Sequence, residues 1–205
     1  MYGQLPTNGF IWITMSSIDK AKLRTVYLRK RKMLSSEMSA HIAGRILEQF
    51  KLFLTQIQVK NTHVFLPITK QNEINTWLIV DYLLSQHIDT VVSQSKLETN
   101  QLIHYLYKNP NQLEHNKWGI PEPVHGTVIS EQDIDLVLVP LVVFDRQGHR
   151  IGYGKGYYDR FLAGCRPDCL KVGLSMSPPL DIIPYVDTYD IPLDYCITPL
   201  KTYHF

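Results

Sequence analysis

The chain has 205 residues, 44% of them hydrophobic, and a net charge of +2 at pH 7. This size and composition are typical of one globular domain, and the small net charge argues against the broad basic surface of a protein that binds nucleic acid regardless of its sequence. We therefore expect any anion site to be local and expect no nucleic-acid partner.

The cysteines, histidines and apolar runs exclude further classes of protein. Three cysteines form no CxxC pair, so neither a disulfide framework nor a zinc site is indicated. The eight histidines form no HExxH arrangement, and a metal ion would therefore have to be held by oxygen. No apolar run reaches the roughly 18 residues that span a bilayer. These features predict a cytoplasmic protein without membrane contact.

Helical signals begin near residue 17. The stretch SSIDKAKLR follows Met15 and is typical of a helix start, with Ser17 or Asp19 as the N-cap. We interpret residues 1–16 as an N-terminal extension that arises from the choice of start site, and residues 17–205 as a single domain.

Helix and strand signals alternate from there on. Apolar residues recur every three or four positions in the expected helices, and short apolar runs predict strands between them. The expected elements in chain order are helices 19–34 and 37–56, strand 62–67, helix 73–86, strands 90–93 and 101–107, and a proline-rich loop over 109–126.

The run DLVLVPLVVFD, residues 135–145, is nearly all aliphatic, as expected of a strand that helices cover on both faces. Its combination with the alternating helices predicts the fold class. We expect an α/β fold in which a single three-layer domain has a central, mostly parallel sheet flanked by helices.

The segment RIGYGKGYYDR, residues 150–160, follows this strand after a turn at DRQG and leads into a short expected helix, 157–164. A strand, a glycine-rich loop and a helix in this order present backbone N–H groups and the positive end of a helix dipole to an anion. The spacing fits neither GxxxxGK[ST] nor GxGxxG. The segment is a candidate phosphate site, and the alternative of a glycine-rich surface turn leaves Lys155 between two glycines unexplained.

The longer segment VPLVVFDRQGHRIGYGKGYYDRFL resembles the signature of the 5-formyltetrahydrofolate cyclo-ligases, also called methenyltetrahydrofolate synthetases. Other motifs of that family have counterparts in the same order: DKAKLR, LPITKQNEINTWLI, WGIPEP and IPLDYCITP resemble its first helix, its proline-ended strand, its Gly-Ile-x-Glu-Pro loop and its C-terminal strand. The likeness covers residues 17–200, and an ordered set of motifs is more specific than any one of them.

The resemblance implies a ligase that converts 5-formyltetrahydrofolate and ATP to 5,10-methenyltetrahydrofolate, ADP and phosphate with the help of Mg²⁺. The formyl oxygen is a poor leaving group, and its phosphorylation by ATP lets the neighbouring nitrogen displace it. Such an enzyme must chiefly hold two anionic ligands in line and neutralise charge on the moving phosphoryl group. We expect a monomer, and the number of glutamates on the folate stays open.

The resemblance places the ATP phosphates against the glycine-rich segment. Lys155, a compact charge, and Arg150 are the expected catalytic residues. Both also belong to the expected nucleotide-binding residues, which are Lys20, Arg24, Arg150, Gly152, Tyr153, Gly154, Lys155, Gly156, Tyr157 and Tyr158. Tyr158 is equally suited to the hydrophobic core.

Asp159 and Asp194 stand where the resemblance implies magnesium ligands, which suits a hard cation that prefers oxygen. Their alternative roles are a carboxylate in the first turn of a helix and a surface charge at the end of a strand.

For the folate, the resemblance implies contacts from Glu73, whose carboxylate suits the donor pair of the pterin ring, and from Ile68. Tyr153 and Tyr157 offer flat faces to the folate or the adenine ring. Trp118 would line the folate pocket or pack beneath a loop. The alternative role of Glu73 is that of an ordinary acidic residue in the first turn of a helix.

Two positions depart from the family pattern. Leu141 stands where a glycine is usual, and residues 176–179 lack a common glutamine. We expect these changes to affect folate contacts rather than nucleotide binding.

Two other functions fit parts of the pattern. A binder of folate or nucleotide without catalysis would have lost Lys155 or Asp159, and a sugar-phosphate isomerase on a related scaffold would need neither Lys20 nor Arg24. The basic run RKRK, residues 29–32, is expected to be a solvated helix face.

Overall fold

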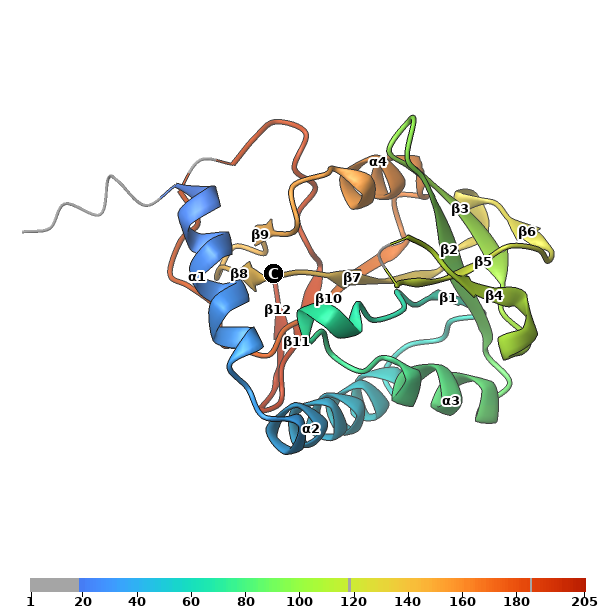
Figure 1. Cartoon of the computed structure of the whole chain (residues 1–205), viewed down its shortest axis with the longest axis horizontal. Coiled ribbons are helices and arrows are strands. Elements are labelled where there is room, and N and C mark those ends of the chain that lie inside the picture. Colours follow the sequence, from blue (N-terminus) through green and yellow to red (C-terminus); the bar gives the residue numbers. More distant parts are fainter. Residues whose placement is uncertain (1–18, 118, 185) are drawn as a thin grey trace, which may run out of the picture.

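A central sheet covered by helices on both faces forms the molecule (Figure 1). The computed structural model describes residues 19–117, 119–184 and 186–205. The expected extension, residues 1–16, and Trp118 lie outside these residues. The helices are α1 (Lys20–Lys32), α2 (Ser36–Leu54), α3 (Trp77–Ser85), α4 (Tyr157–Gly164) and the short 3-10 helices η2 (Thr69–Gln71), η3 (Pro110–Gln112) and η4 (Glu131–Asp133).

The described residues place eight strands in the main sheet, in the spatial order β12-β11-β10-β7-β1-β2-β3-β6. The strands from β11 to β2 are parallel, and β12, β3 and β6 join them antiparallel at the two edges. Their bounds are β1 Asn61–His63, β2 Asp89–Lys96, β3 Gln101–Leu106, β6 Val128–Ile129, β7 Leu136–Pro140, β10 Leu170–Leu174, β11 Tyr195–Ile197 and β12 Thr202–His204. The predicted fold, a mostly parallel sheet between helices, is confirmed.

The aliphatic run of β7 is explained by the two cores that it joins. Leu136 and Leu138 belong to the core under α2 and α3, whereas Val137 and Val139 belong to the core under α4. Side chains alternate between the faces of a strand, so a strand covered on both sides must be apolar throughout. Figure 1 shows α2 and α3 along one side of the sheet and α4 on the other.

Several predicted boundaries were wrong. The strand expected over 62–67 ends at His63. The strand expected over 135–145 ends at Pro140, and the next residues form the hairpin of β8 (Val143–Phe144) and β9 (Arg150–Ile151). The loop expected over 109–126 contains a second hairpin, β4 (Leu113–His115) with β5 (Pro121–Pro123). The helix expected from residue 73 begins only at Trp77.

Asp145 holds the turn that follows β8. This carboxylate is fully buried and accepts hydrogen bonds from the backbone N–H groups of Gln147 and His149 at 2.9 Å and of Ile183 at 2.8 Å. A buried carboxylate needs such donors, and here they close the DRQG turn. Gly148, with φ at 83°, completes the predicted turn.

Gly173 in β10 has no room for a side chain. A Cβ there would lie 2.6 Å from Cδ1 of Leu193 and 2.8 Å from Cδ2 of Leu141, the residue that departs from the family pattern. We predict that Gly173→Ala lowers the free energy of unfolding by about 1–3 kcal/mol, as overpacking does. Urea unfolding measures the change.

Gly44→Ala in α2 is the matched control, because nothing lies within 4 Å of a Cβ at that position. Alanine favours a helix over glycine, so this variant should gain up to about 1 kcal/mol. Equal effects of the two substitutions would contradict the packing argument.

Candidate active site

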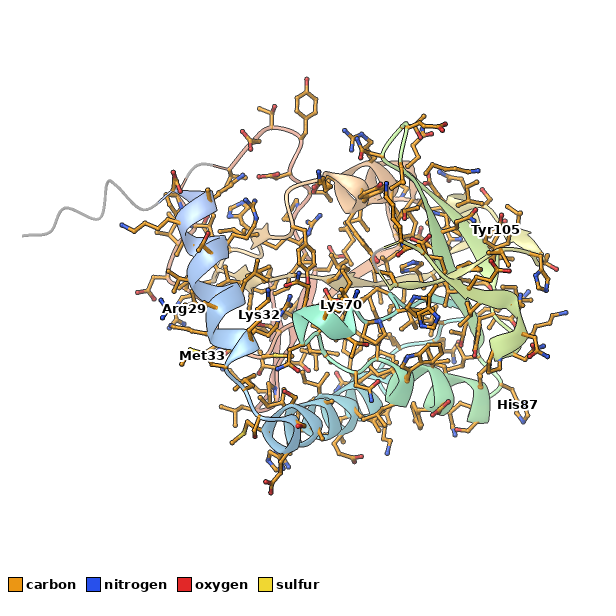
Figure 2. All side chains as sticks on the ribbon, viewed as in Figure 1. Arg29, Lys32, Met33, Lys70, His87 and Tyr105 are labelled. Atoms are coloured by element: carbon orange, nitrogen blue, oxygen red, sulfur yellow. The ribbon has the colours of Figure 1, made fainter. Side chains whose placement is uncertain are left out.

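A cavity of about 1120 Å³ opens at the carboxyl end of the parallel strands. Ligand pockets usually measure about 300–1000 Å³, so this one has room for two ligands. Figure 2 labels Lys70 on η2, which forms part of the wall. The cavity brings together most of the predicted site residues: Lys20, Arg24, Ile68, Glu73, Arg150, Gly152, Tyr153, Gly154, Lys155, Gly156, Tyr157, Tyr158 and Asp159.

The glycine-rich loop is shaped by two of its three glycines. Gly154 and Gly156 have φ values of 84° and 70°, which side chains tolerate poorly. Gly152 does not have a positive φ, but its carbonyl accepts a hydrogen bond of 2.7 Å from Nε of Arg24. The guanidinium of Arg24 also lies 3.1 Å from where a Cβ of Gly154 would stand. Close approach of Arg24 therefore docks α1 on the loop.

Lys155 lies exposed at the tip of this loop. Throughout the described parts of the chain, no carboxylate lies within ion-pair distance of its ammonium group, although its backbone carbonyl accepts a hydrogen bond of 3.1 Å from Arg160. The ammonium group is therefore available to an anionic ligand in the cavity.

Arg150 is a buried anchor, with a side chain that is 6% exposed. Its guanidinium donates to Oδ1 of Asp159 at 2.6 Å and to the carbonyl of Ile191. Burial lowers the pKa of Arg150, and the charge of Asp159 opposes that shift. The expected catalytic arginine thus joins β9, α4 and the segment that precedes β11.

Two carboxylates that the sequence analysis missed lie beside this anchor. Asp190 and Asp187 accept from Nζ of Lys20 at 2.5 and 3.0 Å. Burial opposes ionisation of Lys20, but the two carboxylates raise its pKa. Lys20 and a backbone N–H likewise lower the pKa of Asp190 against the effect of burial. Asp190 stands four residues before Asp194, directly ahead of the IPLDYCITP motif. This position was the sequence feature that could have identified Asp190.

Asp194 does not line the cavity. Its Oδ2 accepts from the backbone N–H of Lys171 at 2.7 Å and from Nζ of the same residue at 2.9 Å. These contacts lie at the amino end of β10 and β11, whereas the cavity lies at the carboxyl end. Of the two expected metal ligands, only Asp159 reaches the cavity. Its Oδ1 lies 3.4 Å from the backbone N–H of Ile191, next to Asp190.

Glu73 is held in the cavity by two donors, one of which belongs to the glycine-rich loop. The hydroxyl of Tyr153 donates to Oε1 at 2.5 Å, and the backbone N–H of Ile68 donates to Oε2 at 2.6 Å. Burial raises the pKa of Glu73 and of Tyr153. Glu73 precedes α3 by several residues, so the reading as a first-turn helix acid was wrong.

Arg31 was also missed, because the basic run was expected to be solvated. Its guanidinium donates to the hydroxyl of Tyr153 and lies 5.5 Å from the centre of that ring. Arg29 and Lys32, labelled in Figure 2, are exposed as expected. The spacing of Lys20, Arg24 and Arg31 places all three on one helix face and could have identified Arg31.

Tyr158 and Tyr157 both line the cavity, but only Tyr158 also packs in the hydrophobic core. Tyr158 packs against both hydrophobic cores and also lines the cavity, and burial raises its pKa. Tyr157 lines the cavity, and its pKa is raised by burial and by the charge of Glu122.

A polar chain lies beneath α4, beside the cavity. Nε2 of His63 is 2.7 Å from Oγ of Ser93, which is 2.8 Å from Nδ1 of His104. Nε2 of His104 lies 3.5 Å from Oε1 of Glu131, whose side chain is 34% exposed. Phe161 of α4 packs on both imidazoles, with ring centres 4.9 and 4.0 Å away. Burial lowers the pKa of both histidines, that of His104 to about 4.

Comparison with known proteins gives one consistent result. Residues 16–199 match the model of the 5-formyltetrahydrofolate cyclo-ligase family. The chain is 28% identical to a 5-formyltetrahydrofolate cyclo-ligase of Mycoplasma genitalium, over 87% of this chain and 94% of that one. It is 26% identical to a protein of the same name from Haemophilus influenzae, over 87% and 97% of the two chains.

Solved structures agree with the sequence relatives. The NMR structure of 5,10-methenyltetrahydrofolate synthetase from Aquifex aeolicus superposes with a TM-score of 0.78 at 31% identity and covers 90% of this chain and 92% of its own. The synthetase from Mycoplasma pneumoniae gives a TM-score of 0.70 at 26% identity, over 88% and 99%. No helix among the described residues is long and apolar enough to span a membrane.

The buried histidines predict a pH dependence of stability. A histidine whose pKa is lowered on folding binds fewer protons when folded, so it destabilises the fold as the pH falls from about 6.5 toward about 4. For His104 this amounts to about 2 kcal/mol between pH 7 and pH 5. We predict that His104→Phe removes this part of the acid sensitivity in urea unfolding at the two pH values. The same loss of stability in the variant and the wild type would contradict it.

Proposed function

The chain belongs to the 5-formyltetrahydrofolate cyclo-ligase family, and on that premise we propose the reaction that it catalyses and the residues that carry it. The protein converts 5-formyltetrahydrofolate and ATP to 5,10-methenyltetrahydrofolate, ADP and phosphate. ATP phosphorylates the formyl oxygen. The 10-nitrogen of the folate then attacks the activated carbon, and phosphate leaves.

One observation supports this proposal above the others. A single cavity of about 1120 Å³ is lined both by a loop with an available lysine and by a buried carboxylate that Tyr153 of the same loop contacts. The lysine suits phosphates, and the carboxylate with its aromatic neighbour suits a pterin. A reaction that transfers a phosphoryl group between two bound ligands needs both groups in one space.

On the nucleotide side, Lys155 meets the transferring phosphoryl group, and the loop backbone from Gly152 to Gly156 approaches the phosphates. Lys20 and Arg24 bring positive charge from α1. Arg150 acts through Asp159, because its guanidinium already has two protein partners. It is therefore a positioning residue in this proposal, in place of the catalytic role expected from the sequence.

Mg²⁺ fits the carboxylates of the same side. Magnesium bound with a nucleotide usually takes one or two carboxylates, phosphate oxygens and waters. Asp159 and Asp190 are the two that we assign, with Asp190 in place of the expected Asp194. The described residues contain no group of three or more His, Cys, Asp and Glu side chains that could hold a metal ion by itself. When bound, the ion would neutralise phosphate charge.

On the folate side, Glu73 accepts from the pterin ring, and Ile68 and Tyr157 contact the ligand. Arg31 and Tyr153 keep the Glu73 carboxylate in place. A contact of Trp118 with the folate stays a prediction. So do the monomeric state, the cytoplasmic location and a substrate with several glutamates.

The first test is the reaction itself. We predict that the purified protein, given ATP, Mg²⁺ and 5-formyltetrahydrofolate, forms one ADP for each methenyl product, measured by ADP release and by the absorbance of the methenyl compound. A folded protein that binds both ligands but forms no product would overturn the proposal. Lys155→Ala should lower kcat on the order of 100-fold and leave folate affinity within about threefold, since it removes charge stabilisation from the transfer step.

A matched pair of substitutions tests the metal assignment. We predict that Asp190→Asn raises the Mg²⁺ concentration for half-maximal activity about tenfold or more, because it removes a carboxylate ligand. Asp194→Asn, four residues away and bonded to Lys171 outside the cavity, should leave that concentration unchanged. A Mg²⁺ titration of both variants measures these concentrations. A raised concentration for Asp194→Asn with an unchanged one for Asp190→Asn would assign the metal ligand to Asp194 instead.

A further inference from the structure

The chain of His63, Ser93, His104 and Glu131 is polar where an apolar core would be more stable. Its two imidazoles are buried, and within the described residues Nε2 of His104 makes no hydrogen bond, although Oε1 of Glu131 lies 3.5 Å away. An unpaired buried polar group costs on the order of 1–3 kcal/mol. Such a cost calls for a role beyond packing.

Ser93 and His63 both line the cavity. Ser93 lies on β2 and is partly exposed, whereas His104 lies behind it and Glu131 lies toward the outside of the molecule. Gly164 at the end of α4 leaves space for the Glu131 carboxylate, which a Cβ there would overlap. The four side chains therefore form a continuous path from the cavity to the outside.

Counting protons leaves two possible directions for these bonds, and a proton relay from the cavity to His104 uses one of them. Ser93 has one hydroxyl proton and two lone pairs, so it donates to one imidazole and accepts from the other. If it donates to Nδ1 of His104, the proton of neutral His104 sits on Nε2 and points toward the Glu131 carboxylate. Ser93 then accepts from Nε2 of His63 and keeps one lone pair for the cavity.

The proposed reaction requires a proton acceptor at this stage. When the 10-nitrogen attacks the activated carbon, its N–H bond must break for the methenyl product to form. That nitrogen is an arylamine conjugated to a benzoyl group, and once it has attacked it is a strong acid. A weak base therefore suffices, and a neutral imidazole offers the free lone pair that the proton needs.

We propose that Ser93 is a further catalytic residue, which takes the proton of the folate 10-nitrogen during ring closure and passes its own proton to His104. This inference rests on the proposed function. The C–N bond forms with the lone pair of the 10-nitrogen, the C–O bond breaks, and phosphate leaves with that electron pair. The electrons of the N–H bond stay on nitrogen, and the charge on His104 is balanced by Glu131.

The test separates ring closure from phosphoryl transfer in a single turnover. The enzyme is mixed with 5-formyltetrahydrofolate, ATP and Mg²⁺, and ADP formation and methenyl absorbance are followed in parallel. Ser93→Ala should slow methenyl formation on the order of 100-fold while ADP forms at the wild-type rate, so that a phosphorylated intermediate accumulates. His104→Phe should give the same split, and Ser93→Thr, which keeps the hydroxyl, should restore most of the rate.

Ser95→Ala is the matched control. Ser95 lies two residues along the same face of β2, but its hydroxyl donates to the Glu122 carboxylate and not to a histidine. It should keep both rates within about threefold. If Ser93→Ala leaves ring closure unchanged, or slows both steps equally, the proposal is wrong while the proposed reaction stands. If the wild type forms neither ADP nor the methenyl product, the proposed function fails first and this inference with it.

Discussion

The buried guanidinium of Arg150 connects three segments that form the site. It bonds Asp159 at the start of α4 and the carbonyl of Ile191, and it is itself on β9. Removing a charge from water costs several kcal/mol unless partners of good geometry replace the water, so these three segments stabilise the guanidinium only together. The glycine-rich loop, the α4 terminus and the carboxylates of the C-terminal segment are therefore fixed by one constraint.

The residues assigned to the nucleotide and those assigned to the folate use charge in different ways. On the nucleotide side, Lys20, Arg24 and Lys155 are exposed or lie in partly buried ion pairs and hydrogen bonds, which an anionic ligand can replace at small cost. On the folate side, Glu73 is buried and already bonded by Tyr153 and a backbone N–H. Such a carboxylate is preorganised, so it can orient a ring without first being ordered.

Helix α4 joins the site to the polar chain beneath it. Its first residues, from Tyr157 to Asp159, form the cavity wall, and Phe161 one turn later packs on His63 and His104. The aromatic ring keeps water from the two imidazoles, which lowers their pKa values and maintains both as neutral groups. The position of the loop and the state of the buried histidines thus depend on the same short helix.

The sequence by itself determined the family, the α/β fold and the glycine-rich loop, because those are recorded in local patterns: helical periodicity, an aliphatic strand and ordered motifs. Tertiary structure alone decided which charges meet. Asp190 reaches the cavity and Asp194 does not, although four residues separate them, because the chain runs from one end of the sheet to the other between them. Arg31 likewise gains its partner Tyr153 from a loop far along the chain, and Ser93 meets His63 of β1 as well as His104 of its own hairpin. Pairings between distant segments leave no periodic signal in either one.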